Sequence, residues 1–440
     1  MKKTTIPTET ILSNLGIGSL NEMQMQTLEE IKSQDELVLL SATGSGKTLA
    51  FLLPLVQSIK AGTKTTSALI VVPSRELAMQ ITQVAKKMGT GLKITACYGG
   101  HKREIEENDL VEPPAIIVGT PGRLGDHFRR GNITVETIRF LVLDEFDKSL
   151  ELGFQDEMQF ILGSLPHIKT KILTSATDSV EVPAFVGLKD PQKLDYLSGE
   201  SASTALDVRV VSSDRDKLET LFKLICALGN RLSIVFCNHR EAVERISNYL
   251  SEKGITNEFY HGGMEQYERD SALSKFRNGT TSLLITTDLA ARGLDIPHIR
   301  YILHYHLPLN EESFTHRNGR TARMYASGTA ILILGPDETL PAYINGEATP
   351  MFLPDDDVLP EKPKWTTLFI AAGKKEKVNK VDILGFLINK ANLKKEDIGV
   401  IDVKDHSSFV GIRKTKMHTT LHLIKDEKIK NKKVKMTIAK

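Results

Sequence analysis

The stretch 37–48 constrains the fold of this chain more than any other. Four apolar residues, Leu-Val-Leu-Leu, lead into the loop Ser-Ala-Thr-Gly-Ser-Gly-Lys-Thr, and an apolar helical pattern follows. The apolar run predicts a buried strand, and glycines at a helix start let backbone N–H groups turn toward a phosphate. Lys47 would reach the outer phosphates, and the Thr48 hydroxyl would hold Mg²⁺. The order strand, loop, helix therefore predicts a nucleoside-triphosphate site in an α/β fold.

Short apolar segments alternate with helical patterns in two successive parts of the chain. This alternation predicts two parallel-sheet domains, because parallel strands need helical crossovers between them. Pro191 and the Ser- and Gly-rich stretch 198–204 predict a linker between the two domains. The expected strands are 68–72, 94–98, 115–118, 140–143 and 172–174 in the first domain, and 232–236, 258–260, 282–286, 301–304 and 329–334 in the second.

The C-terminal part of the chain differs from the rest in charge. Residues 364–440 contain 19 Lys+Arg and 8 Asp+Glu, a net of +11, whereas residues 1–363 contain 38 and 47, a net of −9. Concentrated positive charge favours a nucleic-acid-binding module, although a solvated lysine-rich surface is the alternative. Strands at 365–371, 398–403, 409–413 and 434–438 and helices at 380–391 and 417–424 give the order βαββαβ of an RNA-recognition-motif-like domain.

Other features of the composition limit the class of protein. The three cysteines, Cys97, Cys226 and Cys237, are far apart and form no CxxC pair, so neither a zinc site nor a disulfide framework is expected. The N-terminus lacks an apolar signal region, and no apolar run reaches membrane-spanning length. We therefore expect a cytoplasmic protein without membrane contact. The proline- and acid-rich segment 337–363 predicts a linker or a strap along the surface.

Two further groups complete the predicted triphosphate chemistry. The apolar strand 140–143 ends in Asp144 and Glu145, which would hold Mg²⁺ through water and activate the attacking water, respectively. In the second domain, Arg320 and Arg323 are three residues apart and would share one helix face. Guanidinium groups directed at the outer phosphate stabilise the charge of the transition state. A solvated basic helix is the alternative for this pair.

Together these segments resemble the DEAD-box RNA helicases over residues 10–335. In the first domain the resemblance rests on Gln24, the loop 42–48, Pro-Ser-Arg-Glu-Leu-Ala at 73–78, Gly99-Gly100, Thr-Pro-Gly-Arg at 120–123, Asp-Glu-Phe-Asp at 144–147 and Ser-Ala-Thr at 175–177. In the second it rests on His-Gly at 261–262, Gln266, Arg269, the run 286–295 and His-Arg-Asn-Gly-Arg-Thr-Ala-Arg at 316–323. The resemblance implies two tandem RecA-like domains, ATP and Mg²⁺.

The resemblance also assigns roles to single residues. The implied catalytic groups are Lys47, Asp144, Glu145, Arg320 and Arg323. ATP would be bound by Gln24, Thr43, Gly44, Ser45, Gly46, Lys47, Thr48 and Asp295, and Mg²⁺ by Thr48 and Asp144. Hydrolysis would be coupled to domain closure by Asp147, Ser175, Thr177 and His316. RNA would be held by Arg75, Gly99, Gly100, Thr120 and Arg123 in the first domain and by Gln266, Arg269 and Thr286 in the second.

Two positions depart from the family pattern. Pro7 stands where the family usually has an aromatic residue about seventeen positions before the adenine-reading glutamine, so the ring that stacks on adenine is missing from this position. Phe146 stands where the family name has alanine. The two catalytic acids and Asp147 remain, so we expect hydrolysis to survive. We expect the bulky ring to lie beside the closing interface and to alter how the domains dock.

The tail resembles the RNA-binding domain of DbpA-type helicases, bacterial ribosome-assembly enzymes that recognise a hairpin of large-subunit ribosomal RNA. The resemblance rests on pattern more than on a sharp motif, and an unrelated basic domain of similar fold is the alternative. Phe409 is the main candidate for stacking on a base, with a core position as its alternative. Arg413 and Lys414 are candidates for phosphate contact.

The sequence thus predicts an α/β protein of two RecA-like domains (1–200 and 201–340), a linker (341–363) and a basic RNA-binding domain (364–440). Its predicted function is ATP-dependent local unwinding of RNA duplexes, directed to ribosomal RNA during large-subunit assembly, with pre-ribosomal particles as partners of a monomer. The alternatives are an ATP-dependent RNA clamp or scaffold with little turnover, and a general RNA helicase or chaperone. A DNA helicase or translocase with the same nucleotide site is a further alternative, and a metabolic kinase is disfavoured.

Overall fold

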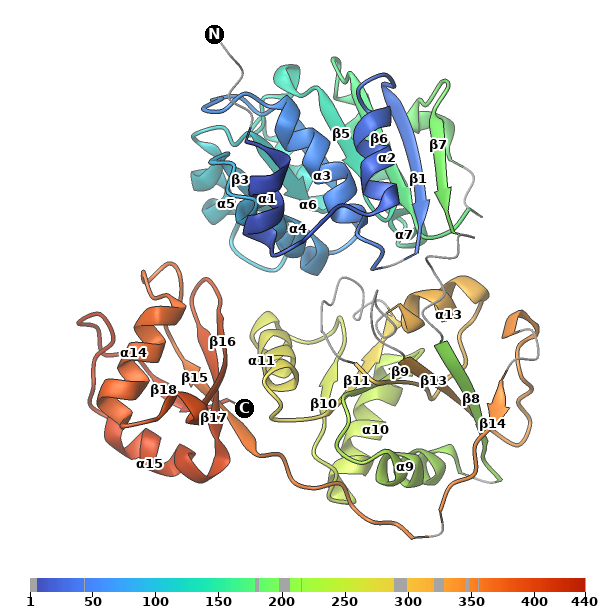
Figure 1. The fold of residues 1–440 in the computed structure, drawn as a ribbon, viewed down its shortest axis with the longest axis vertical. Helices are drawn as coiled ribbons and strands as arrows, with labels where there is room; N and C mark the ends of the chain where they lie inside the picture. Colours follow the sequence, from blue (N-terminus) through green and yellow to red (C-terminus); the bar gives the residue numbers. More distant parts are fainter. Residues whose placement is uncertain are drawn as a thin grey trace. The chain divides into compact units, whose positions relative to one another are not determined.

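The computed structural model describes residues 6–42, 44–178, 182–197, 206–214, 216–288, 299–319, 328–344, 348–354 and 356–439 (Figure 1). The described chain divides into two compact units, one before residue 198 and one after residue 205. The first unit contains one sheet, and the second contains a large sheet and a small one. Within the described residues, no helix is both long and apolar enough to cross a membrane.

The first unit is a seven-stranded parallel sheet with the strand order β3-β4-β2-β5-β6-β1-β7. Every residue of β2 and β4 is buried, as expected for parallel strands covered by helices on both faces. The elements are α1 Thr8–Leu15, α2 Glu22–Glu30, β1 Glu36–Ser41, α3 Lys47–Ser58, β2 Ala68–Val71, α4 Arg75–Lys87, β3 Ile94–Cys97, α5 Arg103–Leu110, β4 Ile116–Gly119, α6 Pro121–Arg129, β5 Phe140–Leu143, α7 Phe146–Glu151, α8 Gln155–Gly163, β6 Thr170–Ser175 and β7 Gln192–Tyr196.

The segment after Pro191 is not a linker, contrary to the expectation from sequence. It forms β7, which pairs with β1 at the edge of the sheet. The sequence Gln-Lys-Leu-Asp-Tyr has no apolar run, and only Leu194 is buried, because an edge strand is covered on fewer sides than a central one. The other expected linker residues, 198–204, lie outside the described residues.

The second unit begins with another seven-stranded parallel sheet, in the order β10-β11-β9-β12-β13-β8-β14. Numbered from its own first strand, this is the order of the first sheet, so the two domains share one topology. The elements are β8 Leu206–Ser212, α9 Lys217–Leu228, β9 Ser233–Cys237, α10 Arg240–Glu252, β10 Glu258–Tyr260, α11 Gln266–Arg277, β11 Leu283–Thr287, β12 Tyr301–His304, α13 Glu311–Asn318, β13 Gly328–Leu334 and β14 Thr349–Pro350.

The predicted linker 341–363 is a strap on the second domain. Its strand β14 pairs with β8, and Met351 and Leu353 pack on the core beneath that strand. Near the end of the strap, the Asn230 side chain donates a hydrogen bond to the Glu361 carbonyl at 2.5 Å. The strap therefore belongs structurally to the second domain until a few residues before β15.

The C-terminal domain has the predicted order βαββαβ. Its antiparallel sheet runs β16-β17-β15-β18, and both helices pack on one face over Leu387, Met417 and their apolar neighbours. Asn379 begins α14 with a capping box, in which its side chain accepts from the Asp382 N–H. The elements are β15 Trp365–Ile370, α14 Lys380–Ala391, β16 Ile398–Val403, β17 Ser408–Arg413, α15 Lys414–Ile424 and β18 Met436–Ile438.

The other face of the small sheet lies against α11 of the second domain (Figure 1). Asn278 Nδ2, just past α11, donates to Thr367 Oγ1 at 2.8 Å, and both residues are buried. The Tyr267 ring of α11 meets the ring of Phe369 edge to face, with centroids 5.3 Å apart. Ser274 Oγ donates to Asp402 Oδ2 at 3.2 Å. The contact thus combines buried polar pairs with aromatic packing.

Candidate functional site

The carboxyl edge of the first sheet brings the predicted residues together in two groups. The neighbouring strands β5, β6 and β1 end at Leu143, Ser175 and Ser41, so Asp144 and the start of the phosphate loop lie at one edge. On the other half of the same edge, β3, β4 and β2 end just before Gly99, Thr120 and Arg75. Ligands of open parallel sheets bind beyond the carboxyl ends of the strands. One edge therefore presents the predicted ATP residues and the predicted RNA residues side by side.

The phosphate loop is held by α2 through Gln24. Gln24 Nε2 donates to the Gly46 carbonyl at 3.2 Å, and Asn21 Nδ2 donates to the Ser45 carbonyl at 3.0 Å. Gly46 has φ of 97°, and a Cβ there would lie 2.4 Å from Gln24 Nε2, so only glycine fits. The Lys47 ammonium donates to the carbonyls of Ser41 and Ala42. The lysine thus reaches back across the loop that a phosphate would occupy.

Asp144 is a buried carboxyl group at the end of β5. Burial, followed by the neighbouring charge of Glu145, raises the pKa of Asp144 to about 6. Thr174 Oγ1 donates to Asp144 Oδ1 at 2.5 Å, which favours the ionised form and partly opposes this increase. A buried carboxylate at the edge where phosphates would bind supplies the kind of oxygen ligand that Mg²⁺ prefers. The residues present therefore fit that cation.

Glu145 begins the turn into α7 with φ of 48°, a left-handed conformation that is uncommon for a residue other than glycine. Its N–H donates to Thr174 Oγ1 at 3.2 Å, so one threonine side chain fixes both acids. Asp147 on α7 is fully buried. Ser175 Oγ donates to the Thr177 carbonyl at 2.7 Å and accepts from the Thr177 N–H, which closes a tight turn at the end of β6.

The position of Phe146 corrects one expectation. Its ring is 1 % exposed and belongs to the apolar cluster that contains Leu143, Met158 and Ile161. The side chain therefore fills the core of the first domain and does not lie on a surface where it could alter docking. Pro7, the other departure, precedes α1 as its N-cap residue.

Arg75 lies at the start of α4, beside the glycine pair. Its guanidinium carbon is 5.0 Å from the centre of the Tyr98 ring, which supports it by a cation–π contact. A Cβ on Gly100 would lie 2.5 Å from Arg75 Nη1, so glycine allows this close approach. Among the described residues, no acceptor lies within hydrogen-bond distance of Arg75 Nε or Nη1. Both nitrogens are buried donors without an acceptor in the described part of the chain, a requirement that an anion such as a phosphodiester would meet.

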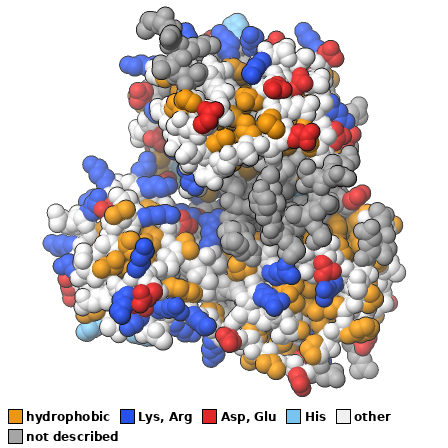
Figure 2. All heavy atoms as spheres, viewed as in Figure 1, with side chains coloured by type: hydrophobic (Ala, Val, Ile, Leu, Met, Phe, Trp, Pro, Cys, Tyr) orange, Lys and Arg blue, Asp and Glu red, His pale blue; other side chains and the backbone are white. Residues whose placement is uncertain are grey.

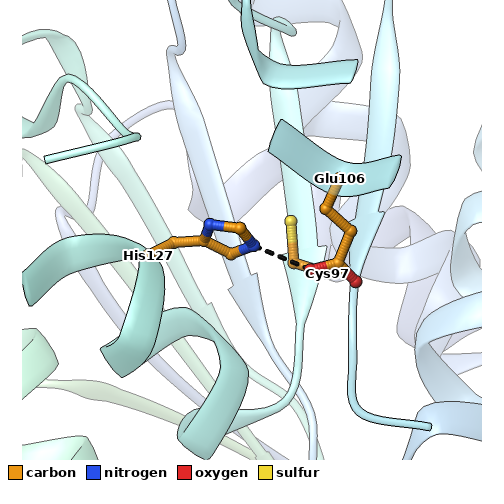
Figure 3. Close-up of side chains that lie close together, drawn as sticks. All are labelled: Cys97, Glu106 and His127. Carbon is orange, nitrogen blue, oxygen red and sulfur yellow. Dashed lines mark hydrogen bonds and ion pairs between the residues drawn. The ribbon is translucent and has the colours of Figure 1, made fainter. Parts of the chain in front are cut away.

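Glu106 is the centre of a buried cluster behind the glycine pair (Figure 3). The donor atoms of Cys97, Glu106 and His127 lie within 4.8 Å of one another, a spacing that a metal ion can bridge. However, Arg123 Nη1 already balances the Glu106 charge at 2.9 Å, and His127 Nε2 bonds the same oxygen at 2.7 Å. Burial raises the pKa of the Cys97 thiol. We therefore interpret this cluster as an ion-pair network.

In the second domain, Arg317 of α13 organises the carboxyl edge. It is 1 % exposed, binds both oxygens of Asp288 at 2.5 and 2.7 Å, and donates to Asn238 Oδ1 and the His306 carbonyl. Burial and the Arg317 charge lower the pKa of the neighbouring His304 to about 3. Arg317 thus joins the ends of β9, β11 and β12. His316, its neighbour, faces Glu312 with Nδ1 3.9 Å from Oε1.

The predicted RNA residues of the second domain occupy different environments. Gln266 and Arg269 lie on the first turn of α11, and Gln266 Nε2 donates to Asp270 Oδ1 at 3.0 Å. Thr286 is fully buried, and its hydroxyl donates to the Tyr260 carbonyl at 2.8 Å. The assignment of the Thr286 side chain to RNA is therefore corrected: it joins the ends of β10 and β11. In the sequence, nothing distinguishes Thr286 from any other buried residue of a strand.

Four of the predicted site residues lie outside the described residues, namely Thr43, Asp295, Arg320 and Arg323. Their assigned roles remain predictions.

The C-terminal domain corrects the stacking assignment of Phe409. Its side chain is fully buried against Phe369 and the Tyr267 ring of α11, so it packs in the contact with the second domain and lies outside the apolar core cluster beneath α14 and α15. Arg413 stacks over the Trp365 ring at 4.8 Å, and Lys414 begins α15 with an exposed side chain. Figure 2 shows lysine and arginine side chains spread over this domain at the lower left.

Sequence reasoning assigned no role to Glu106, Arg317 or Asn278. Arg317 was visible only as one basic residue in the run 316–323, and Glu106 as one of several acids on α5. A weak signal exists for Glu106, since Glu106 and Leu110 are four residues apart and share the buried face of that helix.

Three family models match successive parts of the chain. Residues 21–184 match the DEAD/DEAH box helicase family, residues 216–325 the helicase conserved C-terminal domain, and residues 367–438 the DbpA RNA binding domain. The matched ranges correspond to the two parallel-sheet domains and the small antiparallel domain.

Full-length relatives agree with these matches. The chain is 32 % identical over 442 residues to the ATP-dependent RNA helicase DbpA of Escherichia coli (strain K12). The aligned region covers 98 % of this chain and 97 % of that protein. It is 29 % identical to the protein of the same name from Bacillus subtilis (strain 168), over 97 % of this chain and 96 % of that protein.

Solved structures support the fold. The DEAD-box helicase Mss116 bound to single-stranded RNA and UDP-BeF matches with a TM-score of 0.70 and 25 % identity, covering 80 % of each chain. Dbp5 of S. cerevisiae, bound to RNA and ADP BeF3, matches with a TM-score of 0.67 and 24 % identity over 78 % of this chain and 93 % of that chain, which supports the fold alone. The chain belongs to the DEAD-box family of ATP-dependent RNA helicases, with two RecA-like domains and a C-terminal RNA-binding domain of the DbpA type.

Proposed function

We propose that this helicase uses ATP, with Mg²⁺, to open short RNA duplexes locally in large-subunit ribosomal RNA during ribosome assembly. The RNA would be structured rRNA in pre-ribosomal particles, and the protein would act as a cytoplasmic monomer. The proposed domain limits are 1–200, 201–340 and 364–440, with the strap 341–363 between the last two. The assignment to ribosomal RNA derives from the DbpA-type C-terminal domain.

The division of the first sheet edge carries this proposal. The strands β2 and β5 are neighbours, with Val71 paired to Leu143. β2 belongs to the half of the sheet that leads to Arg75 and the glycine pair, and β5 to the half that leads to Asp144. A shift of β5 or α7 on ATP hydrolysis would therefore act directly on β2, the strand that precedes Arg75. This adjacency gives a physical route from hydrolysis to RNA release.

Each described ATP-site residue has a chemical task in this proposal. Gln24 shapes the phosphate loop, and Lys47 leaves the loop carbonyls to bind the outer phosphates. Thr48 and Asp144 would hold Mg²⁺, which neutralises charge on the triphosphate when bound. Glu145 orients the attacking water and accepts its proton. Asp147, Ser175 and Thr177 would respond to hydrolysis, together with His316 of the second domain.

The RNA contacts of the RecA-like domains would be independent of sequence. Backbone N–H groups at Gly99, Gly100 and Thr120, with Arg75, suit the phosphates of one strand. Gln266 and Arg269 would add contacts from the second domain. Contacts to phosphate position a strand but do not read its bases, so sequence preference must come from the C-terminal domain.

In the C-terminal domain, the sheet face is occupied by α11, so RNA would bind elsewhere on its basic surface. Arg413 and Lys414 are the proposed phosphate contacts. Arg413 is supported by the Trp365 ring, which restricts its rotamers and lowers the entropy lost on binding.

The test is ATP hydrolysis by the full-length protein without RNA, with an unstructured single strand, and with a fragment of large-subunit ribosomal RNA that contains the hairpin. We expect the hairpin fragment to stimulate hydrolysis strongly at concentrations where the single strand does not. Equal stimulation by all RNAs would support the general helicase instead. Hydrolysis that no RNA stimulates would favour the clamp or scaffold, and unwinding of DNA duplexes would favour a DNA helicase.

A further inference from the structure

Glu106 on α5 receives hydrogen bonds from three separate segments of the first domain. Its Oε1 accepts from the Tyr98 N–H at 2.8 Å, just past β3, and lies 2.9 Å from His101 Nε2 in the following loop. Its Oε2 accepts from Arg123 Nη1 at 2.9 Å and lies 2.7 Å from His127 Nε2, both on α6. The Glu106 side chain is 2 % exposed. All of its acceptor capacity is used inside the protein.

The segments that Glu106 joins are those that carry the proposed RNA contacts. Gly99 and Gly100 lie between Tyr98 and His101, so both ends of the glycine pair are tied to one carboxylate. The Tyr98 ring in turn touches the His101 ring, with centroids 4.8 Å apart, and supports the Arg75 guanidinium. The network therefore extends from the buried carboxylate to the donors of Arg75 that face no protein acceptor.

Arg123 is enclosed by the same network. Its Nη1 is held by Glu106, its Nη2 donates to the His101 carbonyl at 3.2 Å, and its side chain is 14 % exposed. The guanidinium thus bridges α6 to the loop after the glycine pair. A bidentate bridge of this kind fixes both orientation and distance, which a lysine could not do.

We propose that Glu106 is a positioning residue for RNA, which fixes the glycine pair against the start of α6, and that Arg123 acts through Glu106 and the His101 carbonyl and not as a direct phosphate ligand. This inference rests on the proposed role of the Gly99–Gly100 and Thr120 segments in RNA binding. It adds to that role the residue that sets the spacing of their backbone donors.

The chemistry requires an ionised carboxylate at this position. Burial raises the pKa of Glu106, but the bonds from His101, His127 and the Tyr98 N–H and the Arg123 charge outweigh it and set the pKa to about 2. A glutamine has one acceptor oxygen and one NH₂ group, so it must face one pair of donors with a donor of its own. Glu106→Gln therefore keeps the volume of the side chain but places an NH₂ group against hydrogen-bond donors.

The test compares Glu106→Gln with Glu107→Gln in the full-length protein. Glu107 is the next residue on α5, is 35 % exposed and pairs with Arg103 at 2.8 Å, so it controls for loss of an acid on this helix. We expect Glu106→Gln to raise the RNA concentration for half-maximal ATPase stimulation about tenfold, the loss of one or two charge-assisted hydrogen bonds. The rate at saturating RNA and the nucleotide affinity without RNA should stay within about twofold.

Two further variants keep the test decisive if Glu106→Gln destabilises the domain. His101→Ala removes one donor from a loop and should raise the same RNA concentration in the same direction, by less. In a double-mutant cycle, Arg123→Met and Glu106→Gln should be strongly non-additive in this quantity, because both break one bridge.

The outcomes separate this inference from the proposed function. If RNA stimulates the wild-type protein and Glu106→Gln has an unchanged half-maximal concentration, the positioning role is wrong and the proposed function stands. If Arg123→Met and Glu106→Gln are additive, Arg123 contacts RNA directly and that part is wrong. If RNA does not stimulate the wild-type protein, the proposed function itself has failed.

Discussion

Thr174 Oγ1 on β6 donates a hydrogen bond to Asp144 Oδ1 at the end of β5, across 2.5 Å. The bond links two neighbouring strands at the edge where the triphosphate is proposed to bind. Without a cation, burial and the Glu145 charge favour the neutral carboxylic acid, and the threonine hydroxyl opposes them. Asp144 is therefore a group whose ionisation depends on what binds beside it.

The first prediction concerns pH. Because the pKa of Asp144 is raised to about 6, the carboxyl binds a proton as the pH falls below this value and then binds Mg²⁺ poorly. We expect kcat/KM for ATP, measured at saturating RNA and Mg²⁺, to fall with an apparent pKa near 6, since this ratio reports the free enzyme. The acid limb of kcat should lie at lower pH, because the bound cation favours the carboxylate.

Thr174→Val provides the matched variant for this prediction. It keeps the shape of the side chain and removes the hydroxyl that stabilises the ionised form, so the acid limb of kcat/KM should move to higher pH. An acid limb at the same pH in both proteins would assign it to another group.

The second prediction separates binding from chemistry at the ATP site. Lys47→Ala should weaken nucleotide binding and abolish RNA-stimulated hydrolysis, since it removes the ammonium group that reaches across the loop. Glu145→Gln should bind nucleotide normally but lower kcat by about 10²-fold or more, the scale of a lost general base. Fluorescent-nucleotide titration and steady-state ATPase assays measure the two effects. Lys60→Ala, at an exposed position, should change neither quantity.

The third prediction concerns the buried Arg317. Replacing it with methionine leaves Asp288 and the His306 carbonyl without their main donor in a buried setting. We expect a loss of about 3 kcal/mol in the free energy of unfolding, as for other broken buried pairs. Denaturant titration followed by fluorescence measures it. Arg209→Met, which breaks an exposed pair with Asp207, should cost less than about 1 kcal/mol. Similar losses in both variants would contradict an organising role for Arg317.

The fourth prediction concerns the contact between α11 and the C-terminal sheet. Asn278→Ala removes one of the two side-chain partners of the buried Thr367 hydroxyl and leaves Thr280 Oγ1 at 2.8 Å as the other, so we expect a cost of about 1 kcal/mol. We expect faster proteolysis at the end of the strap and a lower melting temperature of the full chain. Asn230→Ala, which removes an exposed bond to the strap, is the control for loss of an asparagine. Equal protease resistance in both variants would show that this contact does not hold the domain.

The central strands were predictable because buried parallel strands are continuous apolar runs. The strand 140–143 was predicted at its observed limits, as were β16 and α14. By contrast, β7 and β8 were missed. In β7, Gln192–Tyr196, a single residue is buried. In β8, Leu206–Ser212, apolar and polar residues are mixed and few are buried, because this strand pairs with the short edge strand β14. Strands at or near a sheet edge carry little apolar signal, and only the completed sheet defines them.

The candidate site was predictable where a residue type and its spacing decide the chemistry, as in the loop that contains Lys47. It was not predictable where the burial of a side chain decides the role of that residue. Phe146 follows the two acids, yet its ring fills a core, and Phe409 is buried in the contact with α11. Glu106 is one of several acids on a polar helix, and only the packing of α5 against β3 and α6 distinguishes it from Glu107. Sequence periodicity identifies a helix face but not its neighbours.

The strap along the second domain sets how far the C-terminal domain can travel when the contact with α11 opens. A free segment of this length would allow wide diffusion, but β14 and the Asn230 bond to Glu361 attach the strap to the second domain at two places. Only residues 362–364 separate that bond from β15, a reach of about 10 Å when extended. Because this connection is so short, the C-terminal domain rebinds the second domain at an effective concentration of about millimolar or more. An RNA that engages this domain is thereby delivered to the second RecA-like domain as an intramolecular ligand.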